Sequence, residues 1–166
     1  MSKLNARHVL QFVILILIQG LILDHIHFLG YINPYLYIIF IILLPLKTNR
    51  IYLLLLSFFL GLGIDLFNDT GGIHAASSLC IAYLRPIFVR LSFGINYDLN
   101  TIKLSSAKLR AQLLFIFFMV FTHHLIMFSL EYFNINYSPE ILKNTLYSGI
   151  FSSLIIYLII LLTRKA

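Results

Sequence analysis

The sequence predicts an all-α integral membrane protein, a single domain over residues 1–166, with about six transmembrane helices and both termini in the cytoplasm. Three observations support this. Apolar residues make up 60% of the 166 residues and charged residues only 11%, whereas soluble domains carry about 25% charged residues. The apolar residues fall in long runs, as in membrane spans. Basic and acidic loops alternate along the chain.

Six apolar runs are expected to be spans, each needing about 20 residues. The first, residues 8–29, is longer than the apolar region of a signal peptide and has no small-residue cleavage site after it. The second, residues 34–47, is short. It opens at Asn33-Pro34, a favourable helix start, and meets Pro45 near its end, so it must lean on its neighbours or thin the bilayer. The others are expected at residues 51–67, 72–92, 110–131 and 141–163.

The charges orient these spans. With the N-terminus inside, the cytoplasmic segments collect Lys and Arg, and Lys143 is the only cation in the outer loops, as the positive-inside rule requires. The net charge of +6 is thereby explained without nucleic acid. The single cysteine excludes a disulfide within the chain. The inner set is Lys3, Arg7, Lys47, Arg50, Arg90, Lys103, Lys108, Arg110, Arg164 and Lys165, and the outer acids are Asp24, Asp65, Asp69, Glu131 and Glu140.

One sizeable loop, about residues 92–109, is expected in the cytoplasm. Its basic end, residues 103–110, mixes leucines with cations. Such a stretch either lies against anionic lipid headgroups or is an ordinary basic loop that sets the topology.

The third span carries a stripe of small residues that ends in a carboxylate. Ser57, Gly61 and Asp65 recur every four residues and therefore share one helix face. Small residues let helices approach closely in lipid, so we expect Asp65 to face a neighbouring helix. A structural turn follows at Asp69, Gly71 and Gly72, where glycine supplies positive φ.

The fourth span has a second small face, Ala75 and Ala82, and a polar edge formed by His74, Ser78 and Arg85. Pro86 follows Arg85 and is expected to kink the helix. Arg85 either binds an acidic group, such as a lipid phosphate or a partner's carboxylate, or anchors the inner end of the span by snorkelling.

Polar residues concentrate in the outer half of the spans. Histidine with carboxylate is typical of metal or catalytic sites, but no HExxH motif or nucleophile elbow is present. Adjacent histidines on a helix also point about 100° apart. We therefore expect interhelical contacts or interfacial residues, with no metal, cofactor or catalytic residue. The group comprises Asp24, His25, His27, Asp65, Asp69, His74, His123, His124, Asn144 and Ser148.

Three stretches resemble the rod shape-determining protein MreD family of bacteria. They are Asn33-Pro34-Tyr35 before a short span ending in Leu43-Leu44-Pro45, the run of residues 61–76 (GLGIDLFNDTGGIHAA), and Leu84-Arg85-Pro86. Members of this family have about this length and about six spans, so the resemblance extends loosely over the whole chain.

The resemblance implies a non-enzymatic subunit of the cell-elongation machinery in the bacterial inner membrane. Its fold would be similar to the S-component of energy-coupling-factor vitamin transporters. The implied partner is a bitopic MreC-type protein, and indirect partners are an MreB-type filament and RodA with a class B penicillin-binding protein, which make peptidoglycan and set cell shape. Asp65 and the Gly71-Gly72 turn would be structural landmarks, and Arg85 a functional candidate.

The sequence is compatible with three functions. The leading hypothesis is a scaffold subunit whose partner helices or lipids bind at the small faces, Ser57/Gly61 and Ala75/Ala82, and near Asp65 and Arg85. The alternative is an S-component-like transport subunit that binds a vitamin-sized ligand at the outer polar cluster. A third is a small membrane enzyme acting on lipid phosphates, with Asp65, Asp69 and His74 as its acid–base set.

Overall fold

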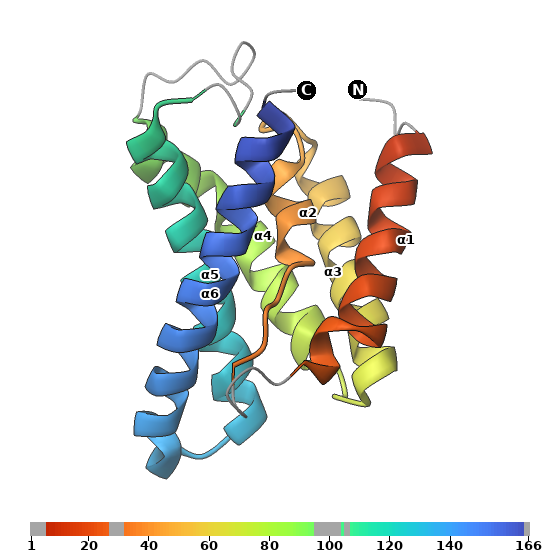
Figure 1. Ribbon diagram of the computed structural model, residues 1–166, viewed down its shortest axis with the longest axis vertical. Helices are drawn as coiled ribbons and strands as arrows, with labels where there is room; N and C mark the ends of the chain where they lie inside the picture. Colours follow the sequence, from red (N-terminus) through yellow and green to blue (C-terminus); the bar gives the residue numbers. More distant parts are fainter. Residues whose placement is uncertain (1–5, 27–31, 95–103, 105–106, 165–166) are drawn as a thin grey trace.

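A computed structural model of the protein describes residues 6–26, 32–94, 104 and 107–164. Every regular element in these residues is a helix, which confirms the all-α prediction. Figure 1 shows their arrangement. The elements are α1 (Ala6–Leu21), the 3₁₀ turn η1 (Leu23–His25), α2 (Ile38–Leu43), α3 (Arg50–Asn68), α4 (Ile73–Phe93), α5 (Leu109–Tyr132), the 3₁₀ turn η3 (Ile135–Tyr137) and α6 (Ser138–Arg164).

Five helical stretches of the described chain are long and apolar enough to cross a membrane. The protein therefore has the character of a multi-pass membrane protein. Helices α3 to α6 begin and end within three residues of the expected bounds. The apolar runs predict these bounds well because each spanning helix needs enough consecutive apolar residues to cover the thickness of the bilayer.

The second span is a correction to the sequence prediction. Instead of a helix over residues 34–47, α2 has only six residues, a length of about 9 Å at 1.5 Å per residue. Leu44, which precedes Pro45, leaves the helix with φ −53° and ψ 141°, since a residue before proline disfavours the α conformation. A non-helical segment, residues 32–37, precedes α2. This lead-in and α2 together run from one end of the bundle toward the other (Figure 1).

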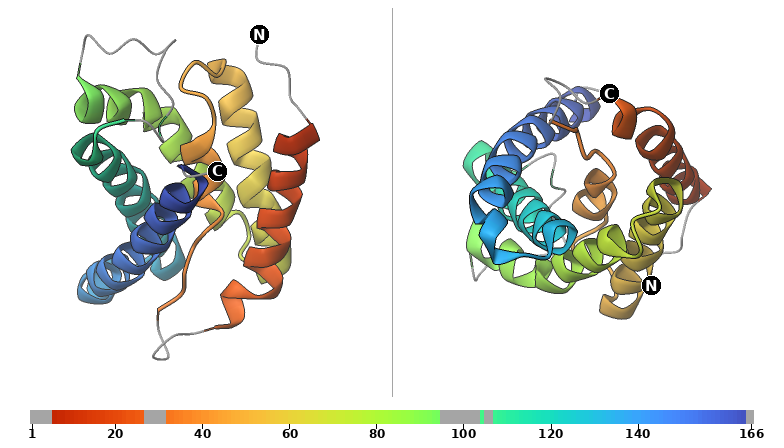
Figure 2. Two further views of the ribbon diagram at one scale, coloured as in Figure 1. Left: turned by 45° about the horizontal axis from the view of Figure 1, so that its top comes forward. Right: turned by 90° about the horizontal axis from the view of Figure 1, so that it is seen from below.

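The short helix lies inside a ring of the longer ones. Seen along the bundle, α2 occupies the centre, and α1, α3, α4, α5 and α6 surround it (Figure 2). Residues Ile38–Ile42 are all buried, and they form a core with apolar side chains of the surrounding helices. The interior of the bundle is therefore filled by a segment that is only partly helical.

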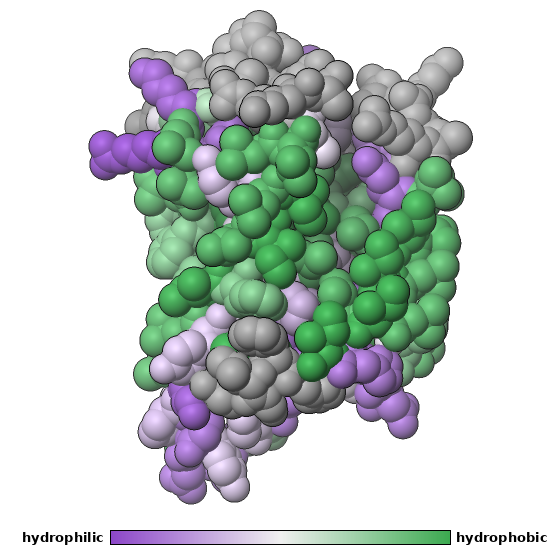
Figure 3. All heavy atoms as spheres, in the orientation of Figure 1, coloured by the Kyte–Doolittle hydropathy of each residue, from purple (hydrophilic) through white to green (hydrophobic). Residues whose placement is uncertain are grey.

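The outer surface matches a lipid environment. An apolar band covers the middle of the visible face, with hydrophilic residues at both ends (Figure 3). Large apolar side chains such as Leu17, Phe59, Ile87, Phe117 and Ile150 are exposed on five different helices. A soluble monomer rarely exposes apolar patches of this extent.

The start of α1 and the end of α6 lie at the same end of the bundle (Figure 1). Arg50 begins α3, and Arg90 lies in the last turn of α4, so both belong to this end. Asp69 and Glu131 belong to the opposite end, because they lie at the end of α3 and the end of α5. The expected separation of basic and acidic residues is therefore present in the fold.

Most of the expected cytoplasmic loop, residues 92–109, lies outside the described residues, and so do Lys3, His27, Lys103 and Lys165. Of the described part, Leu104 and Ala107 are buried. The Nε2 of Gln112 on α5 donates a hydrogen bond to the Leu104 carbonyl at 2.6 Å. This end of the loop is thus attached to the bundle.

Candidate functional site

Asp65 of α3 caps the N-terminus of α4. Its Oδ1 accepts the backbone N–H of His74 and its Oδ2 that of Ala75, both at 2.9 Å. The Thr70 hydroxyl donates to Oδ1 at 2.5 Å. The first N–H groups of a helix have no partner within it, and a carboxylate there also stabilises the helix dipole. The prediction that Asp65 faces a neighbouring helix is confirmed.

Gly61 brings the backbones of α3 and α4 together one turn before this cap. A Cβ at position 61 would lie 2.3 Å from the His74 carbonyl oxygen. The turn after Asp65 has the expected left-handed residues, with φ of 55° at Asp69, 63° at Gly71 and 100° at Gly72. The Gly61–Asp65 spacing is therefore a packing and capping unit, in which the glycine admits α4 and the carboxylate holds its first turn.

The two predicted small faces are buried inside the chain. Ser57, Gly61 and Asp65 lie in the α3 interior face, and Ala75 and Ala82 in that of α4. These faces are occupied by this chain's own packing and do not form an exposed surface for a partner helix. The small residues allow two helices to approach closely, as expected, but both helices belong to this chain.

Arg85 binds the C-terminal end of α2. Its side chain is 2% exposed, and its guanidinium donates to the carbonyls of Ile42 at 3.4 Å, Pro45 at 3.3 Å and Leu44. The last carbonyls of a helix lack partners within it, and a cation there complements the helix dipole. Within the described chain its partners are thus backbone carbonyls, and the buried guanidinium does not reach the end of the bundle by snorkelling. The binding of an acidic group from lipid or a partner stays a prediction.

Gln19 of α1 binds the lead-in at the other end of α2, and sequence reading missed it. Its Oε1 accepts from the backbone N–H of Leu36 at 2.8 Å, and its Nε2 donates to the Pro34 carbonyl at 3.0 Å. Nε2 also donates to Asp24 Oδ1 at 2.6 Å. Non-helical backbone at membrane depth requires protein partners. The available signal was an amide in the apolar stretch that runs from Phe12 to Leu23.

Both adjacent histidines of α5 contact elements around the lead-in. His123 Nε2 lies 2.7 Å from the Tyr37 hydroxyl. His124 Nε2 lies 3.4 Å from Ser152 Oγ of α6, and that hydroxyl accepts the Tyr35 backbone N–H at 2.9 Å. The expectation of contacts between elements is confirmed for both histidines, although Ser152 was not singled out from the sequence.

A polar pocket of about 160 Å³, referred to below as the outer pocket after the expected topology, opens at the end of the bundle opposite the start of α1 and the end of α6 (Figure 1). Asp24 forms one wall, and its Oδ2 accepts a hydrogen bond from Asn68 Nδ2 at 2.7 Å. Of the described members of the outer polar group, Asp24 and His74 line this pocket and the others do not. Asn144 instead donates to the Tyr132 hydroxyl at 3.0 Å. The pocket is lined by Asp24, Asn33, Tyr35, Asn68, Thr70, Ile73, His74 and Glu131.

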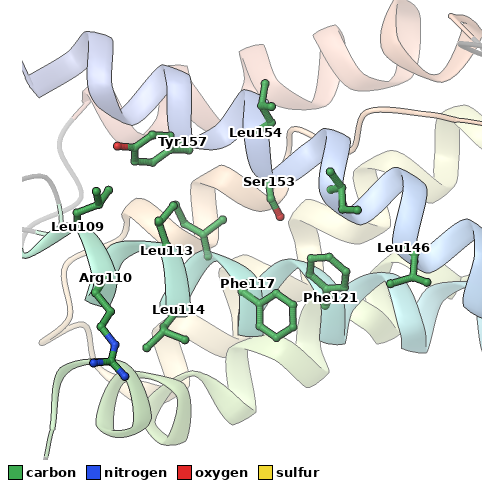
Figure 4. A pocket seen from close by; sticks show the side chains of 12 residues that line it. Leu109, Arg110, Leu113, Leu114, Phe117, Phe121, Leu146, Ser153, Leu154 and Tyr157 are labelled. Carbon is green, nitrogen blue, oxygen red and sulfur yellow. The ribbon is translucent and has the colours of Figure 1, made fainter.

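A second, larger space is an apolar groove between α5 and α6 with a volume of about 930 Å³. Figure 4 shows Phe117 and Phe121 on α5 facing this space and Ser153 pointing from α6 toward α5. Ser153 Oγ is buried and has no hydrogen-bond partner among the described residues. The groove runs along α5 from Leu109 to Phe121, about 18 Å at 1.5 Å per residue.

No family model, curated protein or solved structure matches this chain. Within the described ranges, no group of three or more His, Cys, Asp and Glu side chains is placed to hold a metal ion. The function of the protein is therefore inferred from its own residues.

Proposed function

We propose that the protein is a non-enzymatic membrane subunit of a bacterial rod, or cell-elongation, complex. It binds the transmembrane helix of an MreC-type bitopic partner and so helps to organise peptidoglycan synthesis by RodA with a class B penicillin-binding protein. The chain lies in the bacterial cytoplasmic membrane with both termini inside, and an MreB-type filament lies beneath it. The proposal includes a fold of the transporter S-component type.

The observation that carries this proposal is the α5/α6 groove. It is long, apolar and bordered by exposed side chains, including Leu113, Phe117 and Ile150. The unpaired hydroxyl of Ser153 offers one hydrogen bond inside it, and interhelical hydrogen bonds support association in lipid. A single apolar helix with a small or polar residue at that depth fits this surface.

The roles of Asp65 and Asp69 in the structure support a scaffold over an enzyme. Asp65 accepts three hydrogen bonds from its own chain, so its carboxylate is committed to capping α4. Asp69 is exposed in the turn and does not line the polar pocket with His74. The three residues of an acid–base set are therefore not gathered around one space.

The size of the outer pocket favours the scaffold over a vitamin-binding subunit. Its volume is about 160 Å³, whereas sites for drug-sized ligands occupy about 300–1,000 Å³. The centre of the bundle, where a larger ligand would need room, is filled by α2.

Charge placement supports the orientation. Lys47 and Arg50 lie at the α2–α3 junction, and Arg90, Lys108 and Arg110 flank the α4–α5 junction at the same end. The positive-inside rule assigns that end to the cytoplasm.

The test is co-purification with an MreC-type protein encoded in the same genome. Wild-type protein should retain the partner in mild detergent, and Leu113→Trp should reduce its recovery several-fold because the indole fills the groove. Leu55→Trp on α3, a similarly exposed leucine, is the matched control and should retain the partner. Recovery of the wild-type chain without partner would contradict the proposal, and equal recovery with both variants would exclude the groove.

A further inference from the structure

The outer pocket presents hydrogen-bond acceptors and negative charge, with no permanent cation among its described lining residues. Asp24 and Glu131 supply two carboxylates, and Asn33 Oδ1 is a buried acceptor without a partner among the described residues. Gln19 Nε2 and Asn68 Nδ2 donate to Asp24, and Gln19 Nε2 also donates to the Pro34 carbonyl. The lining also includes the hydroxyls of Tyr35 and Thr70, and the Thr70 hydroxyl donates to Asp65. The pocket therefore has acceptors that a bound hydrogen-bond donor would satisfy.

His74 gives the independent sign that this space takes a ligand. It lines the pocket and is 5% exposed, yet its Nε2 has no hydrogen-bond partner in the described chain. Its Nδ1 lies 3.4 Å from Asp65 Oδ1. Thr70 Oγ1, which donates to that carboxylate, lies 3.5 Å from the same Nδ1. The tautomer with its proton on Nδ1, facing these oxygens, leaves Nε2 as an acceptor. A buried acceptor without a partner is costly, and a bound donor removes the cost.

The ring of Tyr35 adds an aromatic wall. It is buried, and its centroid lies 6.0 Å from that of His74 and 5.1 Å from that of His124. Aromatic faces attract ammonium and guanidinium groups. A volume of about 160 Å³ equals roughly five waters at about 30 Å³ each, which suits such a headgroup and excludes a large ligand.

We propose that the outer pocket binds an organic cation, a primary ammonium or a guanidinium group, between Glu131, Asn33 Oδ1 and His74 Nε2. The group is either a free amine outside the cell or a lysine or arginine side chain of an extracytoplasmic segment of another protein. The site stands whether or not the chain belongs to a rod complex, because none of its residues lies in the α5/α6 groove.

The test follows the ¹⁵N resonances of the histidine rings in detergent micelles, with the His74 signals assigned by their loss in His74→Phe. Butylammonium is the probe, and butyramide, which is neutral, is compared with it at matched ionic strength. We expect a saturable shift of His74 Nε2 with butylammonium only. Glu131→Gln should weaken the affinity roughly two- to fivefold, the range for a partly exposed charge pair, and Glu140→Gln on α6 should leave it unchanged.

A blocked peptide, acetyl-Gly-Lys-Gly-amide, distinguishes the two sources of the cation. Tighter binding of the peptide than of butylammonium indicates a side chain from another protein, and tighter binding of butylammonium indicates a free amine. The absence of a shift, an equal shift with butyramide, or an unchanged affinity in Glu131→Gln would overturn the site. Failure of the partner co-purification leaves these measurements unaffected, so the two proposals fail separately.

Discussion

Gln19 and Arg85 bind opposite ends of the same short helix. Gln19, on α1, holds the lead-in at Pro34 and Leu36, and Arg85, on α4, holds the carbonyls at the end of α2. A segment with so few internal hydrogen bonds is viable at membrane depth only where side chains satisfy its backbone. Two polar residues from two surrounding helices thus allow a partly helical segment to run through the interior of the bundle.

Gln19→Leu is expected to destabilise the protein. The leucine fills a similar volume but leaves the Leu36 N–H and the Pro34 carbonyl without a partner, and each such buried group costs roughly 1–3 kcal/mol. The free energy of unfolding, measured by SDS titration in mixed micelles, should fall by about 2–4 kcal/mol. Gln11→Leu, an exposed position of the same helix, should change it little. Equal stability of the two variants would refute the role of Gln19.

Arg85→Met should lower the free energy of unfolding by about 1–3 kcal/mol, because the last carbonyls of α2 lose their donors. The free energy of unfolding of Arg85→Lys should be intermediate between those of Arg85→Met and the wild type, since an ammonium retains the charge but not the planar fork of donors. Arg90→Met, at an exposed position of the same helix, serves as the comparison. A fully stable Arg85→Met protein that has lost bound anionic lipid would instead favour the lipid-binding interpretation.

Asp65→Asn should reduce the amount of folded protein in the membrane. An amide has one acceptor oxygen in place of two, so it cannot receive the N–H groups of His74 and Ala75 together with the Thr70 hydroxyl. We expect the free energy of unfolding to fall by about 1–2 kcal/mol, as is typical for loss of a helix cap. Asp69→Asn, in the exposed turn, should leave it unchanged. Normal accumulation of Asp65→Asn with loss of a lipid-phosphate turnover would revive the enzyme hypothesis.

Gly61→Ala should be more damaging than Gly149→Ala. The new Cβ at position 61 meets the backbone of α4, with the His74 carbonyl at 2.3 Å, whereas at position 149 it meets the ring of Phe121 at 3.3 Å. Overpacking typically costs about 1–3 kcal/mol, and a side chain can move aside more readily than a helix backbone. Folded yield by size-exclusion chromatography measures the difference, and equal yields would contradict the close approach of α3 and α4.

The sequence predicted the long helices well because a span of about 20 residues needs a nearly continuous apolar run. The bounds of α3, α4 and α5 each differ by one residue from those expected. The turn at Asp69, Gly71 and Gly72 was also predictable, because positive φ restricts the residue types that fit. These features depend on local sequence alone.

The second crossing and the site were less predictable because they depend on contacts between distant residues. Pro45 marked the end of α2, but nothing local showed that Arg85, about 40 positions away, would bind the freed carbonyls. Gln19 and Ser152 were overlooked because neither belongs to a recognisable motif and their partners are distant in the sequence. The small faces were expected to be surfaces for a partner, yet sequence cannot tell which helix, from this chain or another, packs against them.

Site-specific photocrosslinking in living cells tests the proposed partner contact most directly. A photoreactive phenylalanine replaces Phe117 in the α5/α6 groove or, as the control, Phe59 on the exposed face of α3. We expect a crosslink to an MreC-type protein from position 117 and none from position 59. Crosslinks from both positions, from position 59 alone, or to lipid only from position 117 would contradict a partner helix in the groove.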